Sequence, residues 1–363
     1  MQDRIQAPDD VELRTLCDEL ARRAGELDRT GDWPAEQLRR CGEAGVFEWF
    51  LPIEYGGQGW DDVAITRGYL QLAQACLSTT FVITQRVGAC KRIAGSTNEA
   101  LKQALLPGLV SGKTFATVGI SHLTTSRRHL ATPVLSAEPT ADGYTLNGYA
   151  PWVTGAQSAD QVVVGAVLVE NGRPTNAELL VVVDTLDPAV KAPDPFPMVA
   201  LSASKTGALQ LNGYQASRSQ VIAGPVEKVL TQGSAGAAGG PQTSTLAVGA
   251  ASASLDLLAR EADRRPELHE AHAALSAEHS DLECDLIAAA KGEPACSSEQ
   301  LRQRANSHVL RASQAALTAT KGAGYLADAQ AGRLCREALF FLVWSCPAPV
   351  QAASLCELAG LTD

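Results

Sequence analysis

The sequence of 363 residues lacks the patterns of several large protein classes. No apolar run reaches the ~18 residues that a membrane-spanning helix requires, and the first ten residues, MQDRIQAPDD, are too polar for a signal peptide. The nine cysteines form no C-x-x-C pair, and no histidines stand at metal-ligand spacing. No G-x-G-x-x-G opens a helix, which argues against a nucleotide-binding parallel sheet. We therefore predict a cytoplasmic protein with reduced thiols, no metal and no membrane span.

Positive charge is scarce as well. Lys and Arg number 30 against 40 Asp and Glu, which gives a formal net charge of −10. Binding to nucleic acid requires clustered basic residues, and the only dense basic spot is TSRRH, with Arg127 and Arg128. The sequence therefore predicts no nucleic-acid partner, but it allows a local anion site at this spot.

The first 110 residues have the spacing of helices. VELRTLCDELARRAGELDR places four apolar side chains on one stripe, opposite Glu, Arg and Asp. A second helix is expected after Asp32, which can cap it, with Pro34 in its first turn and Gly45 at its end. Further apolar helical segments are expected around 62–92 and 97–109. The stripe of the first helix consists of Leu13, Leu16, Leu20 and Ala24.

The middle of the chain changes to short β-rich runs such as DQVVVGAVLV. Pro, Gly, Asn and Asp separate these runs at intervals typical of an antiparallel sandwich or barrel. Ala-rich helical spacing returns over 243–292 and 297–323, and two shorter helices follow. We predict an α+β fold with an N-terminal helical domain (1–111), a central antiparallel β-domain (112–230) and a C-terminal helical bundle (231–363).

Four motifs occur in an order that resembles a known family. GDWPAEQLRRCGEAGVFEWFLPIEYGGQGWD contains a Pro-started helix and a P-x-x-Y-G-G-x-G turn, and LPGLVSGKTFATVGIS leads into the β-domain. GYTLNGYAPWVTGAQSADQVVVGAVL resembles a flavin-facing hairpin, and KGAGYLADAQAGRLCREA resembles a G-x-G-Y and R-D-A segment. Across most of its length the chain resembles the acyl-CoA dehydrogenase superfamily, flavoproteins with two helical domains around a β-domain.

The resemblance implies an FAD between the β-domain and the C-terminal helices, beside an acyl thioester. It places Trp152 against the flavin face and Thr154 near N5, with Ser121, His122 and Val153 also in contact with the cofactor. An aromatic stack and a hydrogen-bond donor at N5 are ways in which a protein tunes a flavin. Without the motif, Trp152 would be read as a core aromatic of a strand.

The loop that the family uses beside its flavin is chemically altered. SHLTTSRRH stands where the family carries T-E-P and G-S-D, so His122 brings an imidazole and Arg127 and Arg128 bring two guanidinium groups. Because Arg suits carboxylate or phosphate, we predict that the two arginines bind substrate. The alternatives are a solvated basic loop and a buried structural histidine.

A second departure concerns the cofactor clamp. The stretch around Asp263, READRRPELHEAHAAL, has Arg264 and Arg265 but lacks the Phe-Gly of the segment that reaches the flavin pyrophosphate of a neighbouring subunit in the family. FMN, or no flavin at all, therefore stays open as an alternative to FAD.

The third departure concerns the catalytic base. Counting forward from Arg336, Ser345 falls on the position of the family's catalytic Glu, and the other family location, near Gly240 and Pro241, offers no carboxylate either. A base needs a proton affinity suited to the working pH, which an isolated Ser hydroxyl does not have. His122 or a water molecule would have to replace the Glu.

These residues support three functions. The first is a flavin-dependent oxidoreductase of acyl-CoA dehydrogenase type, which would carry out α,β-dehydrogenation of an acyl thioester with a non-standard base. The second is a flavin-dependent monooxygenase on the same fold, and the third is a non-catalytic homologue that binds acyl-CoA or a partner chain. The resemblance also implies an electron-transfer partner or a flavin reductase, and a homodimer or homotetramer packed through the C-terminal bundle.

Overall fold

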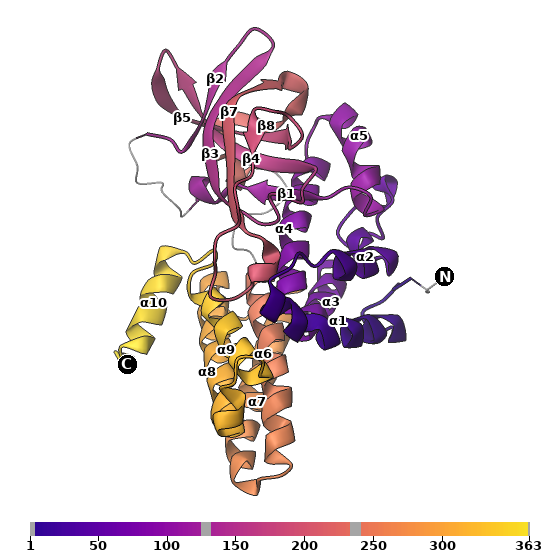
Figure 1. Cartoon of the computed structure of the whole chain (residues 1–363), viewed down its shortest axis with the longest axis vertical. Helices are drawn as coiled ribbons and strands as arrows, with labels where there is room; N and C mark the ends of the chain where they lie inside the picture. The colour runs from indigo at the N-terminus through magenta and orange to yellow at the C-terminus, as the bar shows by residue number, and fades with distance from the viewer. Residues whose placement is uncertain (1–3, 125–131, 233–240, 362–363) are drawn as a thin grey trace.

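The computed structural model describes residues 4–124, 132–232 and 241–361, and it has the predicted order of helices, sheet and helices (Figure 1). The predicted fold class is confirmed, while the exact domain boundaries stay a prediction. The N-terminal helices are α1 (Val11–Thr30), α2 (Ala35–Glu43), α3 (Asp62–Ala75), α4 (Leu77–Ala94) and α5 (Glu99–Val110). The C-terminal helices are α6 (Pro241–Ala262), α7 (His269–Ala290), α8 (Ser298–Gly324), α9 (Gln330–Ala338) and α10 (Ala348–Leu358).

The sheet between the two helical groups is mixed rather than purely antiparallel. Its strands follow the order β6-β7-β3-β2-β4-β5-β8, and β1 pairs with β4 off this path. Both β1 and β2 run parallel to β4, and the other printed pairs are antiparallel. The strands are β1 (Ala116–Gly119), β2 (Leu135–Pro139), β3 (Gly143–Val153), β4 (Gln161–Glu170), β5 (Arg173–Asp184), β6 (Val190–Lys191), β7 (Gly207–Ser217) and β8 (Val221–Glu227).

Several boundaries differ from those expected from the sequence. The apolar stretch 62–92 forms two helices, because Cys76 is extended (φ −157°) between α3 and α4. Asp32 does not cap α2; Pro34 occupies the N-cap position, and its side chain makes no capping bond. The stretch 243–292 likewise divides into α6 and α7.

The sheet buries both of its faces. In β4, Val162 and Val164 pack inside the sheet with residues of β3, β5 and β7, whereas Val163 packs outward with α4 and α5. Successive side chains of a strand point to opposite faces, so a continuous apolar run is what a strand covered on both sides requires. The outer contact attaches the sheet to the N-terminal helices.

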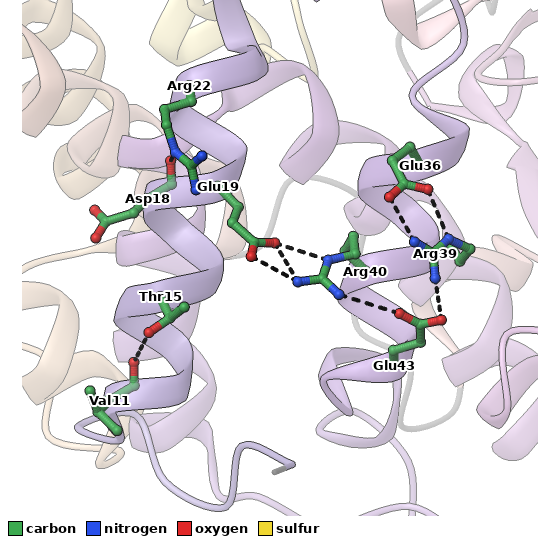
Figure 2. A network of polar contacts seen from close by, with 9 residues as sticks. All are labelled: Val11, Thr15, Asp18, Glu19, Arg22, Glu36, Arg39, Arg40 and Glu43. Carbon is green, nitrogen blue, oxygen red and sulfur yellow. Dashed lines mark hydrogen bonds and ion pairs between the residues drawn. The ribbon is translucent and has the colours of Figure 1, made fainter. Parts of the chain in front are cut away.

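Helices α1 and α2 are joined by an ion-pair network (Figure 2). Arg40 on α2 donates to Glu19 on α1 from Nε at 2.9 Å and from Nη2 at 2.7 Å. Arg39, in contrast, pairs with Glu36 and Glu43 of its own helix. Because solvent screens exposed and partly exposed ion pairs, the network orients α2 more than it stabilises the fold.

The N-terminal and C-terminal helices share one hydrophobic core, and α6 approaches α3 closely within it. At the contact stands Gly249 of α6. A Cβ at this position would lie 2.6 Å from the carbonyl oxygen of Leu70 and 2.8 Å from the Cβ of Ala73. Only a residue without a side chain allows the two backbones this distance.

We expect Gly249→Ala to lower the free energy of unfolding by about 1–3 kcal/mol, because the added methyl overpacks the α3–α6 contact. Gly25→Ala is the matched control. Gly25 lies in α1 with nothing within 4 Å of an added Cβ, so this change should stabilise the protein by about 0.5–1 kcal/mol. Urea unfolding measures the change in unfolding free energy of each variant. The same change in both variants would contradict the close contact at Gly249.

Candidate functional site

A cavity of about 1130 Å³ lies between the sheet and both groups of helices. Its walls come from α3, α4, the end of β1, the end of β3, the first turn of α6 and the segment that follows α9. The wall is mainly apolar, with Phe81, Phe340 and Trp344 in mutual aromatic contact. Phe340 and Trp344 stack at 4.9 Å, and Phe81 meets each of them edge-on.

The end of β3 directs two predicted cofactor residues toward the cavity and one away from it. Trp152 and Thr154 line the cavity, whereas Val153 between them is fully buried in the core of the sheet. The alternation of side chains along a strand requires this arrangement. Val153 could therefore reach a cofactor only through its backbone.

Trp152 and Thr154 have different surroundings. The indole of Trp152 is 49% exposed and meets Phe196 edge-on at 5.0 Å. Thr154 is buried, and its hydroxyl shares a hydrogen bond of 3.0 Å with Thr206, which shares another of 2.8 Å with Ser204. One wall of the cavity thus offers an open aromatic face beside a fixed row of hydroxyls.

Ser121 and His122 lie on the short 3-10 turn η3 (Ser121–Leu123) after β1, but they face different ways. Ser121 lines the cavity, and its buried Oγ has no hydrogen-bond partner within the described residues. His122 is buried and is not among the lining residues; its Nε2 lies 2.7 Å from the carbonyl oxygen of Gly165. Because a carbonyl only accepts, Nε2 carries the proton and Nδ1 keeps a lone pair.

Burial lowers the pKa of His122 from its ordinary value of 6.5, against the smaller opposing effect of the Gly165 carbonyl. The ring is therefore neutral at pH 7. Its Nδ1 is buried without a partner in the part of the chain that the structure describes. A neutral imidazole with a free lone pair can accept a proton, but this one has no direct path to the cavity.

Ser345 lies on the opposite wall, at the end of the turn Phe340–Ser345. Two donors from α8 hold this turn. Arg302 Nη2 donates to the carbonyl of Trp344 at 2.9 Å, and Asn306 Nδ2 donates to the carbonyl of Phe341 at 2.9 Å. Ser345 itself has a left-handed backbone (φ 46°), which is uncommon for a residue other than glycine.

Carboxylates are scarce on the cavity wall. Among the described residues that line the cavity, Asp62 at the start of α3 is the only acid. Three cations also line it: Lys91, Arg92 and Arg336, of which Arg336 pairs with Asp28. The predicted substrate residues Arg127 and Arg128 lie outside the described residues.

The motifs did not reveal several lining residues. Met198 and Thr206 come from the irregular segment before β7, which carries no recognisable pattern. Lys91 and Arg92 stand in the last turn of α4, where basic residues are common because of the helix dipole. Only their orientation, which the sequence does not contain, places them on the cavity wall.

The residues of the sheet wall fit a flavin. An isoalloxazine ring needs a flat apolar surface and hydrogen-bond donors near its nitrogens and oxygens. The half-exposed indole of Trp152 supplies the surface, and the unpartnered Ser121 Oγ supplies a donor. The hydroxyl of Thr154 is already engaged by Thr206 and is oriented by it.

Comparison with known proteins finds similar chains among the acyl-CoA dehydrogenases. Residues 11–113 match the family model "Acyl-CoA dehydrogenase, N-terminal domain". A probable acyl-CoA dehydrogenase of Bacillus subtilis is 27% identical over 240 residues, which are 66% of this chain and 63% of that protein. The solved complex of glutaryl-CoA dehydrogenase with glutaryl-CoA superposes with a TM-score of 0.81 and 20% identity over 96% of each chain. The chain is thus similar to acyl-CoA dehydrogenases in sequence over its N-terminal helices, and it has the fold of these proteins.

A more distant solved structure shows what else this superfamily fold holds. A protein crystallised with FMN and an amino deoxysugar linked to dTDP superposes with a TM-score of 0.69 and 20% identity, over 98% of this chain and 96% of that one. The aligned part of the Bacillus relative is less than two thirds of its length. These likenesses establish the fold, and they leave the reaction and the substrate open.

The lowered pKa of His122 predicts a specific loss of stability in acid. The unfolded chain binds a proton on this ring more readily than the folded chain, so as pH falls below about 6.5 the equilibrium shifts toward unfolding. His122→Gln keeps an N–H that can donate to Gly165 but does not titrate. We expect its unfolding free energy in urea to fall less than that of the wild type between pH 7 and pH 5. Parallel curves for the two proteins would contradict a buried neutral ring.

Proposed function

We propose that this chain is a flavin-dependent oxidoreductase that removes hydrogen across the Cα–Cβ bond of an acyl thioester, with a base other than the family's Glu. The observation that carries the proposal is the pairing of a flavin-compatible wall at Trp152, Thr154 and Ser121 with a large, mainly apolar cavity. In this reaction the α-proton goes to a base, and the β-hydrogen leaves with its electron pair as hydride. The flavin, when bound, accepts that hydride.

The chain's own residues would orient the substrate and move the proton. The aromatic wall of Phe81, Phe340 and Trp344 can hold an acyl chain beside the Trp152 face. We propose that His122 takes the α-proton through a water molecule, because its neutral ring has a free Nδ1 but does not line the cavity. A base at this distance should be slower than a carboxylate in direct contact.

A monooxygenase is the second candidate, and one observation favours it. The turn at Ser345 places a hydroxyl on the cavity wall where the resemblance expects the carboxylate that dehydrogenation uses. A reaction in which reduced flavin activates oxygen does not need that carboxylate. This candidate would require a flavin reductase, whereas the dehydrogenase would require an electron-transfer partner.

FAD is the proposed cofactor, and assembly through the C-terminal helices is the proposed oligomeric arrangement. Support for assembly comes from exposed apolar side chains near the C-terminus: Val343 is 76% exposed, Leu355 60% and Leu358 65%.

Within the described residues, none of the helices has the length and hydropathy that spanning a bilayer would require.

The visible spectrum of the purified, FAD-supplied protein tests the proposed function. We expect a flavin band that an acyl-CoA of four or five carbons bleaches in the absence of oxygen. A band that ignores acyl-CoA, together with oxygen consumption once the flavin is reduced, would favour the monooxygenase. A protein that retains neither FAD nor FMN would contradict both enzyme assignments. The remaining function would be binding of acyl-CoA or a partner chain without catalysis.

Residue 345 allows a matched pair of variants. Ser345→Glu restores a carboxylate on the cavity wall, and Ser345→Gln adds the same bulk without it. Both variants place a residue other than glycine on the same left-handed backbone, so the backbone strain is equal in the two and cancels in the comparison. If the site performs dehydrogenation, Ser345→Glu should bleach flavin about 10²-fold or more faster than Ser345→Gln in anaerobic stopped flow, the usual range for a positioned base. Equal rates would remove position 345 from the proton-transfer path.

A further inference from the structure

The last turns of α4 place two cations on the cavity wall. Lys91 and Arg92 are both half-buried and both line the cavity. Arg92 Nη1 donates to the carbonyl of Gly88, one turn back, at 2.9 Å. A Cβ on Gly88 would lie 3.6 Å from this nitrogen and 3.5 Å from Val118 of β1, so the guanidinium group sits beside β1 where residue 88 has no side chain.

No acid in the described chain forms an ion pair with either cation. Arg336, the third cation of the cavity, is neutralised by Asp28. Burial lowers the pKa of Lys91 and the carboxylate of Asp62 raises it through its negative charge, but the two side chains do not form an ion pair. The internal segments outside the description, 125–131 and 233–240, contain neither Asp nor Glu. This end of the cavity therefore keeps an excess of positive charge.

Burial makes this excess costly. It lowers the pKa of both Lys91 and Arg92 from their ordinary values, because a charge loses hydration when it is buried without a partner. The helix dipole explains why basic residues are favourable in the last turn of α4, but that effect does not require them to face a cavity. An anion from a ligand in the cavity would offset this cost.

We propose that Lys91 and Arg92 form an anion-binding subsite of the cavity, and that the ligand carries a carboxylate or phosphate group in addition to its apolar part. That the ligand is an acyl thioester rests on the proposed function. It narrows the substrate class to acyl thioesters with a second, negatively charged end. An ammonium and a guanidinium group together can bind two oxygens of such a group.

Two acyl-CoAs of equal chain length test the proposal. Glutaryl-CoA ends in a carboxylate and pentanoyl-CoA ends in a methyl group. Calorimetry without oxygen, on protein whose flavin has been reduced beforehand, measures their affinities without turnover. We expect Lys91→Met/Arg92→Met to weaken glutaryl-CoA by about 10- to 100-fold, the range for lost hydrogen bonds to charged groups. Binding of pentanoyl-CoA should change by no more than about twofold, which is below the effect of one such bond.

Two further variants separate a local charge effect from a structural one. Asp62→Asn removes the opposing carboxylate and should strengthen glutaryl-CoA binding, whereas general loosening of the site would weaken it. Arg67→Gln removes an exposed positive charge from α3 outside the cavity and should change nothing. Thermal unfolding of each variant checks that the fold is intact, and Lys91→Arg should restore most of the affinity lost in Lys91→Met.

The outcomes divide clearly. Equal weakening of both thioesters by the double variant would overturn the assignment of a charged acyl end, because the phosphates of CoA are common to both ligands. If the double variant instead weakens FMN but not riboflavin, the subsite stands and its anion is the phosphate of the cofactor. If neither thioester binds the wild type, the thioester part of the proposed function fails. A titration with inorganic phosphate, comparing wild type with the double variant, then still decides whether the two cations bind an anion.

Discussion

The close approach of α6 to α3 at Gly249 is the constraint on which the cavity depends. Helix α3 contributes Asp62 and Tyr69 to the wall, and the first turn of α6 contributes Thr243 and Thr245. Because the two helices belong to one hydrophobic core, these walls stay at a fixed distance even though almost 200 residues separate them in sequence. The sheet is attached to the same core through α4, whose outer contact with β4 sets the position of β1 and of Ser121.

The turn that carries Ser345 is held independently of the side chain at that position. Its carbonyls accept hydrogen bonds from Arg302 and Asn306 of α8, and its aromatic rings stack on one another and on Phe81. A fold held by backbone contacts of this kind tolerates an exchange of the chemical group it presents. The chemical group at position 345 can thus differ while the scaffold stays the same, which is why fold and reaction need separate tests.

The sequence contained much of the fold and less of the site. The stripe of α1, the hairpin around β3 and the two short C-terminal helices were predictable, because apolar spacing and turn residues are local signals. The break at Cys76 was not, since no Gly or Pro marks it and packing against the core decides it. The parallel pairing of β1 with β4 joins segments more than 40 residues apart, and no local pattern encodes it.

Orientation accounts for most of what the sequence could not provide about the site. Val153 was predicted to contact the cofactor together with Trp152 and Thr154, although the alternation of a strand points its side chain to the other face. The short turn after β1 follows no such rule. There, Ser121 faces the cavity and His122 turns toward the carbonyl of Gly165. Which of two neighbouring polar residues faces a ligand depends on which finds a partner in the protein.

The distribution of polarity over the cavity wall has a consequence for catalysis. Aromatic rings line the wall near Ser345, while the unneutralised cations stand on α4 beside β1. A ligand with an apolar part and an anionic end would be held at two separate places, which fixes its orientation before any bond changes. Such fixing can supply a large part of a rate enhancement by removing rotational freedom in advance. It acts equally well for dehydrogenation and for oxygenation. The anion subsite is therefore informative about the substrate whichever reaction the flavin wall performs.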